Sequence, residues 1–280
     1  MEILLGNDVV KEITKQIKKD LEDLNGYIPT LAIVRVGENP DDISYERAAI
    51  KRFEKLGMNT KAIAYSADVD NVSFVNSFKK INEDESINGI LLMRPLPKHI
   101  DEDQITNMID PLKDIDCIGP TNLAKVFASD ESGFEPCTAK AVMEMIDYAG
   151  IDLRGKRAVV VGRSLVVGKP VSMMLMKKNA TITICHTGTK NMEEVCKQGE
   201  ILVAAAGRAK MINEKHVAKG AYVFDVGINV DEEGNLCGDV DMDSIGHLAA
   251  LCTPVPRGVG TVTTSVLAKQ VVKAAKLQKK

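Results

Sequence analysis

Four short runs of apolar and β-branched residues in the second half of the chain constrain its fold more than any other feature. They lie at residues 157–162, 180–185, 200–207 and 221–227, and helical stretches separate the first three. Short strands divided by helices favour parallel pairing through right-handed crossovers. This half therefore predicts an open, doubly wound parallel sheet of the Rossmann-like, dinucleotide-binding kind.

The first half alternates strand and helix in the same way. Apolar residues recur every three or four positions after Asp8, which predicts a first helix. A strand buried on both faces is predicted at residues 30–37, and further strands at 62–67 and 89–93. Helices are predicted at 43–56 and 72–82, and a final helix at 263–276 is expected to return to this half. The fold class is therefore α/β, with two α/β domains flanking a cleft. Residues 110–136, rich in proline and glycine, are predicted to hold the cleft and the hinge.

Composition excludes several classes of function. The 36 Lys and Arg residues against 39 Asp and Glu leave a net charge of −3, which excludes a broad basic nucleic-acid surface. No signal peptide or membrane span is recognisable, so a cytoplasmic protein that does not bind membranes is expected. The six cysteines are scattered singly, which indicates reduced thiols and no metal site.

The run VVVGRSLVVGKP at residues 159–170 carries the clearest local signal. A buried strand leads into Gly162, Arg163 and Ser164, and a second glycine, Gly168, precedes a helix. Small residues at such a turn let the backbone approach a phosphate, and a helix N-terminus favours an anion. The spacing matches neither G-x-G-x-x-G nor a P-loop, so a plain strand-to-helix turn stays an alternative. Arg163 could hold the extra ribose phosphate of NADP.

Other polar turns are expected to border the same crevice, because ligands in open α/β sheets lie outside the carboxyl ends of the strands. His186 and Thr187 follow one predicted strand and Gly207 another, although a lone histidine there is more often a polar loop residue. Asp114 and Asp116 form a possible carboxylate pair, but solvated loop aspartates are commoner. No hydrolase triad, metalloprotease motif or cysteine nucleophile is recognisable, and hydride transfer fits that pattern.

The order of motifs along the chain resembles the methylenetetrahydrofolate dehydrogenase/cyclohydrolase (FolD) family over nearly its full length. The landmarks are Ser44 and Tyr45, RPLP at 94–97, KDIDCIGPTN at 113–122, PCT at 136–138, GRSLVVGKP at 162–170, ATITICHTGT at 180–189, DVGIN at 225–229, GDVD at 238–241 and TPVPRGVG at 253–260. The resemblance implies a folate-binding catalytic domain at 1–138 plus 265–280 and an NAD(P)-binding Rossmann-like domain at 139–264.

The resemblance also implies roles for individual residues. Tyr45 and Asp116 are the expected catalytic residues, with Tyr45 packed on the folate and Asp116 on the hydrogen-bonding edge of the pterin. Pro254, Pro256 and Gly258 complete the implied substrate site. The implied cofactor-binding residues are Gly162, Arg163, Ser164, Gly168, His186, Thr187 and Ile228.

Two departures from the family pattern concern its hydrolytic activity. The family places a lysine four residues after the tyrosine, where this chain has Ala49, and a glutamine where it has Met93. Lys51 lies about 200° further round the helix at about 100° per residue, so it should point elsewhere. Lesser departures are Cys117, Ala139, Arg257, Thr261 and Val262.

These departures favour one activity over the other. Oxidation of a methylene bridge needs no protein base, whereas hydrolysis of a methenyl group needs a proton shuttle, which alanine and methionine cannot supply. We therefore predict a methylenetetrahydrofolate dehydrogenase with weak or absent cyclohydrolase activity. Three alternatives stay open: a fully bifunctional enzyme that uses Arg94 or Lys51, a non-catalytic folate- or nucleotide-binding paralogue, and another Rossmann oxidoreductase. NADP is the preferred cofactor with NAD not excluded, and the resemblance suggests a homodimer.

Overall fold

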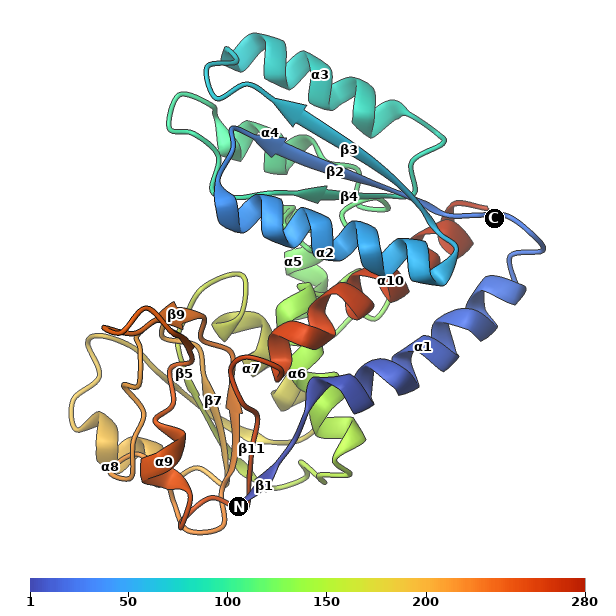
Figure 1. Ribbon diagram of the computed structural model, residues 1–280. Helices are drawn as coiled ribbons and strands as arrows, with labels where there is room; N and C mark the ends of the chain where they lie inside the picture. Colours follow the sequence, from blue (N-terminus) through green and yellow to red (C-terminus); the bar gives the residue numbers. More distant parts are fainter. Residues whose placement is uncertain (280) are drawn as a thin grey trace. The chain divides into compact units, whose positions relative to one another are not determined.

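The computed structural model describes residues 1–279, which form two compact units (Figure 1). The first, here called the six-stranded unit, comprises Met1–Lys11 and Thr138–Thr263. The second, called the three-stranded unit, comprises Glu12–Cys137 and the chain from Thr264 onward. None of the helices within residues 1–279 is long and apolar enough to cross a membrane.

The division differs from the predicted one at the N-terminus. Residues 1–11 were expected in the folate-binding domain, but they belong to the six-stranded unit because β1 (Glu2–Ile3) pairs in parallel with β11 (Leu251–Cys252). Two-residue strands carry too little pattern to be predicted from the sequence. The remaining boundaries, after Cys137 and Thr263, lie one residue from the predicted ones. The ligands assigned to the two domains stay predictions.

The six-stranded sheet has the order β1-β11-β8-β7-β5-β6, and every pair in it is parallel, which confirms the doubly wound prediction. Its longer strands are β5 (Arg157–Val161), β7 (Ile201–Ala204) and β8 (Tyr222–Asp225) in the interior of the sheet and β6 (Thr181–Cys185) at one edge. β5 lies between β6 and β7, so the strand order reverses beside β5. This switch point is where open α/β sheets bind their ligands.

Several short elements complete this unit. They are α6 (Cys137–Tyr148), α7 (Gly168–Lys177), α8 (Met192–Cys196), α9 (Met242–Ile245) and the antiparallel pair β9 (Asn229–Val230) and β10 (Leu236–Cys237). The apolar core includes residues of β5, β7 and β8, whose side chains are buried on both faces of the sheet. That double burial explains why these strands read as continuous apolar runs.

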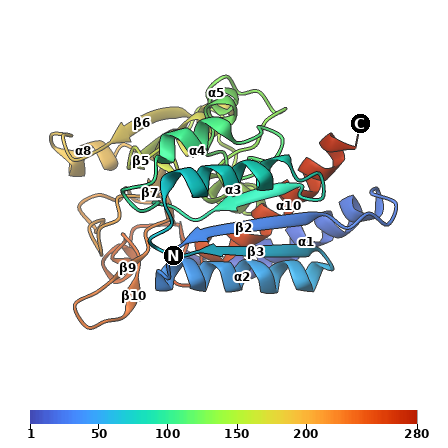
Figure 2. The same ribbon diagram turned by 90° about the horizontal axis from the view of Figure 1, so that it is seen from above.

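The three-stranded sheet is parallel with the order β3-β2-β4. Its strands are β2 (Thr30–Val36), β3 (Asn59–Tyr65) and β4 (Gly89–Leu92). α2 (Pro40–Leu56) covers one face and α3 (Asn71–Glu83) the other, as both views show (Figures 1 and 2). Asn39 caps the start of α2, and Gly57 ends it in the left-handed conformation.

Two further helices lie wholly in this unit, α4 (Glu102–Met108) and α5 (Pro120–Phe127). Two others begin in the six-stranded unit and continue into this one: α1 (Gly6–Glu22), and α10 (Val259–Gln278), which enters it at Thr264. α5 lies inside residues 110–136, where no element was predicted, because eight residues starting at a proline give little periodicity. α10 begins four residues before its predicted start at residue 263.

Candidate active site

The turn after β5 meets the turn after β7 at the switch point of the six-stranded sheet. Gly162 has φ +138°, and a Cβ there would lie 2.2 Å from the carbonyl oxygen of Ala205, the residue that follows β7. Only glycine allows this approach. The two turns therefore form one continuous edge at the carboxyl ends of β5 and β7.

The start of α7 lies against the same turn. A Cβ on Gly168 would lie 2.2 Å from the carbonyl oxygen of Gly162, and the Ser164 hydroxyl accepts a hydrogen bond of 3.1 Å from the amide of Val167. The amides at this helix N-terminus favour an anion such as a phosphate. Arg163 is exposed beside them. Gly162, Arg163, Ser164 and Gly168 are thus brought together as predicted.

A cavity of about 510 Å³ lies at the carboxyl ends of β6 and β7. Its lining residues are Thr187, Asn191, Met192, Glu193, Glu194, Arg208, Met211 and His216. Thr187 was a predicted cofactor residue; the rest were missed, since single polar residues after a strand or in a short helix carry no recognisable pattern. Two methionines supply apolar surface in this cavity, and the other lining residues are polar or charged, so it can contact both the base and the ribose of an adenosine.

The two histidines of this region have different roles. His186 Nδ1 accepts the amide of Gly188 at 3.0 Å, so this side of its ring stabilises its own turn. His216 lines the cavity, and burial lowers the pKa of its imidazole, which keeps it neutral at physiological pH. Neutral imidazole provides both a donor and an acceptor.

The remaining predicted residues of this unit lie on two loops. Ile228 follows β8 and is 69% exposed, which is unusual for a large apolar side chain. Pro254, Pro256 and Gly258 lie between β11 and α10, and a Cβ on Gly258 would lie 2.2 Å from the carbonyl oxygen of Pro254. This loop therefore folds tightly on itself. Its residues belong to the six-stranded unit, whereas Tyr45 and Asp116 belong to the other.

The two aspartates of the KDIDCIGP segment have different environments. Asp114 is buried and accepts hydrogen bonds from the amides of Ile118 and Gly119 and from the Asn122 side chain, and burial raises its pKa to about 6. Asp116 accepts the amide of Cys137 at 2.9 Å. Asp114 thus holds the loop together, whereas Asp116 accepts hydrogen bonds from the backbone amide and the thiol of Cys137.

The pKa of Asp116 is raised because the carboxyl group is desolvated. The Cys137 amide and the positive charge of Arg94 oppose that rise. The carboxylate therefore keeps acceptor capacity that its protein partner does not use, since a carboxylate can accept about four hydrogen bonds.

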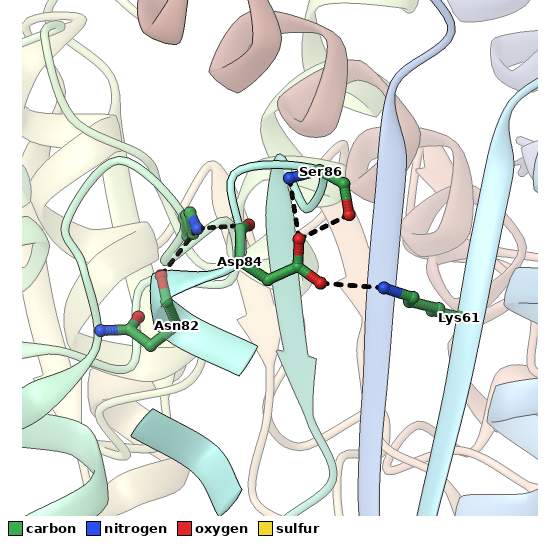
Figure 3. A network of polar contacts seen from close by, with 5 residues as sticks. Lys61, Asn82, Asp84 and Ser86 are labelled. Carbon is green, nitrogen blue, oxygen red and sulfur yellow. Dashed lines mark hydrogen bonds and ion pairs between the residues drawn. The ribbon is translucent and has the colours of Figure 1, made fainter. Parts of the chain in front are cut away.

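Two buried side chains fix the loop that carries Asp116. The ammonium of Lys113 donates to the carbonyl oxygens of Asn82 (2.6 Å) and Asp84 (2.9 Å) at the end of α3, where a cation is favoured. The Asp84 carboxylate in turn accepts bonds from Lys61 and Ser86 (Figure 3). This network joins β3, the end of α3 and the segment that precedes Asp116.

On the other side, Gln270 of α10 holds the backbone around Asp116. Its amide nitrogen donates to the carbonyl oxygens of Ile115 (2.7 Å) and Glu135 (2.8 Å), next to Asp116 and near its partner Cys137. No sequence pattern identifies this residue, because its partners lie 155 and 135 positions away.

α2 and β4 supply the positions where the family pattern departs. Tyr45 is partly buried on α2, and Ala49, one turn further, is fully buried. Met93 follows β4 with 6% of its surface exposed. Lys51 is exposed, and the guanidinium of Arg94 pairs with Glu102 at 3.2 Å. Neither Ala49 nor Met93 has a titratable or hydrogen-bond-donating side chain, and the Met93 thioether is only a weak acceptor.

The doubly wound sheet, the glycine turn and the cavity together define a dinucleotide-dependent α/β protein. The tetrahydrofolate dehydrogenase/cyclohydrolase catalytic-domain model matches residues 4–116, and the model for the NAD(P)-binding domain of the same family matches residues 136–279. The chain belongs to the tetrahydrofolate dehydrogenase/cyclohydrolase (FolD) family, and its six-stranded unit corresponds to the NAD(P)-binding domain.

Relatives match over almost the whole chain. The bifunctional protein FolD of Clostridioides difficile is 50% identical, covering 99% of this chain and 97% of the relative. Among solved structures, the bifunctional FolD of Campylobacter jejuni has a TM-score of 0.95 at 34% identity, covering 99% of both chains. The Trypanosoma brucei FolD, complexed with NADP cofactor and inhibitor, has a TM-score of 0.93 at 32% identity, covering 99% of this chain and 98% of that chain.

Proposed function

We propose that this chain is an NADP-dependent methylenetetrahydrofolate dehydrogenase with weak or absent methenyltetrahydrofolate cyclohydrolase activity. One observation carries the proposal. The tight turn at Gly162 and Gly168 suits the phosphates of a dinucleotide, whereas buried Ala49 and Met93 stand where the family resemblance expects the lysine and glutamine of hydrolysis.

Dehydrogenation needs little chemistry from side chains. NADP, when bound, accepts a hydride, and the methenyl product is stabilised by its own two nitrogens. The protein has to hold the two reactants in contact and exclude water, and such positioning can supply most of the rate. Tyr45 would pack on the folate, and the free acceptor capacity of Asp116 would bind the donor edge of the pterin.

Hydrolysis requires a proton to be taken from water and later delivered. Alanine and methionine can do neither, and the nearby cations are poor replacements. Arg94 is paired with Glu102, and a guanidinium stays protonated at any pH of interest, so it cannot act as a base. Lys51 is exposed and lies about 200° round the helix from Ala49 at about 100° per residue.

The choice of NADP rests on two arginines near the crevice. Arg163 lies beside the N-terminus of α7, and Arg208 lines the cavity that contains Thr187. Either guanidinium could bind the 2′-phosphate of the adenosine ribose, which NAD lacks. The NADP named in the trypanosome structure supports the same choice. A cytoplasmic location and a homodimer stay predictions from the sequence.

Full bifunctionality is the second candidate, because relatives 45–50% identical to this chain are called bifunctional proteins. A single assay distinguishes a dehydrogenase with little or no cyclohydrolase activity from a bifunctional enzyme. Purified protein is mixed with methylenetetrahydrofolate and NADP or NAD, and reduced cofactor and methenyltetrahydrofolate are followed as separate signals.

We expect reduced NADP to appear and methenyltetrahydrofolate to accumulate, decaying no faster than in buffer. Decay well above the buffer rate would establish bifunctionality. Binding of both ligands without reduction of either cofactor would indicate a non-catalytic paralogue.

A further inference from the structure

Two buried aspartates lie beneath the loops of the six-stranded unit that face its crevice. Asp225 ends β8 with 1% of its surface exposed, and Asp239 follows β10 with none exposed. No arginine or lysine side chain pairs with either carboxylate among the hydrogen bonds and ion pairs found within residues 1–279. Each is instead satisfied by amide donors, which is the usual way to keep a buried carboxylate.

Asp239 joins two loops that are far apart in the sequence. Its Oδ2 accepts the amides of Ala206 and Gly207, and its Oδ1 accepts the amide of Arg208 at 2.8 Å. Oδ1 also accepts the side-chain amide of Asn229 at 2.9 Å. One carboxylate thus holds the turn after β7 and the loop after β8 in a fixed relation.

Asp225 in turn holds the backbone of Asp239 in place. Its Oδ1 accepts the amides of Gly227 and Asp239, and its Oδ2 accepts the amide of Val240, each at 3.0 Å. The backbone of Asp239 is therefore fixed by Asp225, and so is the residue that precedes Ile228.

Two glycines make room for the pair. A Cβ on Gly227 would lie 2.2 Å from Oδ1 of Asp239, and a Cβ on Gly238 would lie 1.9 Å from Oδ2 of Asp225. Any larger residue would displace a carboxylate. The glycines of DVGIN and GDVD therefore serve the packing of the two aspartates.

The pair holds the loop of Ile228, which the family resemblance assigns to the cofactor, and the turn of Arg208, which lines the cavity. Ile228 is exposed between Gly227 and Asn229, and both of these neighbours donate to the pair. Arg208, whose amide Asp239 accepts, lines the cavity beside Thr187.

We propose that Asp239, backed by Asp225, is the positioning residue that fixes the Arg208 turn and the Ile228 loop in one arrangement for cofactor binding. It touches neither substrate nor cofactor itself. The inference rests on the proposed function in that the six-stranded unit binds NADP.

The test uses Asp239→Asn, which keeps the shape but turns one acceptor into a donor. However the new amide is oriented, at least one backbone amide of the 206–208 turn loses its acceptor. The matched control is Asp241→Asn, the same substitution two residues along, where the carboxylate caps the short helix α9. For each protein the KM of NADP, the KM of methylenetetrahydrofolate, kcat, the melting temperature and the calorimetric NADP affinity are measured.

We expect Asp239→Asn to raise the KM and the dissociation constant of NADP by about ten-fold or more, because small misplacements of binding groups are costly. The folate KM should stay within about two-fold, and Asp241→Asn should change neither constant. A folded Asp239→Asn protein with unchanged NADP affinity would overturn the inference, as would equal rises in both KM values.

A milder variant decides the matter if Asp239→Asn does not fold. Asn229→Ala removes one donor and creates no clash, and we expect a rise of about three-fold in the NADP constants. No rise would overturn the inference. Wild-type protein that binds NADP but reduces none would instead contradict the proposed function, and the calorimetric comparison of variants would still test the role of Asp239.

Discussion

The two units hold their loops in the same way but differ in what they present for chemistry. In the six-stranded unit, Asp225 and Asp239 fasten the loops after β7 and β8, and Gly162 and Gly168 let the turn at 162–168 pack closely. In the three-stranded unit, Asp114 fastens the loop of Asp116 in the same way, yet Ala49 lies on α2 and Met93 directly follows β4. Under the proposed function, replacing two side chains would remove a proton-transfer activity without changing the fold.

The largest expected effect comes from restoring those two side chains. The double variant Ala49→Lys, Met93→Gln should raise the rate of methenyltetrahydrofolate hydrolysis, because loss of a general acid or base typically costs about 10²–10⁴ in rate. We expect at least about a ten-fold gain, since Ala49 is fully buried and the new lysine has to be accommodated. Decay of methenyltetrahydrofolate is followed spectroscopically with no cofactor present.

Two controls make this result interpretable. Lys51→Ala tests whether the existing lysine supplies the proton chemistry, and it should leave hydrolysis unchanged. The double variant must still oxidise methylenetetrahydrofolate, which shows that its folate site is intact. No gain in hydrolysis in such an active variant would contradict the role assigned to positions 49 and 93.

The next largest effect is expected from Asp116→Asn, which tests the proposed contact with the pterin alone. Asp116→Asn keeps an acceptor for the Cys137 amide but places a donor where the pterin also donates. Hydrogen bonds to charged groups contribute about 1.5–3 kcal/mol, so kcat/KM for methylenetetrahydrofolate should fall by about 10- to 150-fold. The KM of NADP should stay within about two-fold.

The exposed Asp23→Asn, which breaks only a surface pair with Lys276, is the matched control for this substitution. It should leave both kinetic constants unchanged. An equal loss in Asp23→Asn, or a loss confined to NADP, would rule out the pterin contact.

The features of the two units that could be predicted from the sequence are those with a recognisable pattern over a few consecutive residues. The strands at 157–161 and 222–225 are continuous apolar runs, and the turn at Gly162 combines a strand end with small residues before a helix. β1 and β11 are two residues long, and α5 starts at a proline and ends after eight residues, so none of them has a measurable period.

The residues that hold the site could not be predicted for a different physical reason. Gln270 contacts Ile115 across 155 positions, and Asp239 contacts Ala206 across 33. Their partners are backbone groups, which look the same at every position of a sequence. Arg208 follows a glycine after β7, and only the three-dimensional structure shows that it lines a cavity with Thr187.

A smaller effect concerns the choice between NADP and NAD. Arg163→Ala should lower the ratio of kcat/KM for NADP to that for NAD by about ten-fold, because a guanidinium–phosphate contact is a charge-assisted hydrogen bond. Arg208→Ala should lower it less, since Glu193 and Glu194 line the same cavity and repel a phosphate. Arg157→Ala, at the opposite end of β5, is the control and should leave the ratio unchanged. An unchanged ratio in both test variants would place the 2′-phosphate elsewhere.

The smallest expected effect concerns a feature of both units, a buried aspartate whose pKa is raised. Burial raises the pKa of Asp114 and of Asp225 to about 6, above the ordinary value of 3.8 expected in the unfolded chain. Each group then contributes stability that is full below about pH 3.8 and is lost as the pH rises through about 6. Lowering the pH from 7.5 to 5 should therefore raise the melting temperature of the wild type by about 2–4 °C relative to Asp114→Asn or Asp225→Asn.

Asp84→Asn provides the opposite case. The pKa of Asp84 lies well below its ordinary value because Ser86 and Lys61 donate to the carboxylate, so its contribution is present above pH 3.8 and lost only in stronger acid. The difference in melting temperature between the wild type and Asp84→Asn should thus stay constant from pH 7.5 to 5. The melting-temperature differences between the wild type and the Asp114→Asn and Asp225→Asn variants could also prove constant over this pH range. That result would mean that both carboxylates are ionised throughout, because their amide donors outweigh the cost of burial.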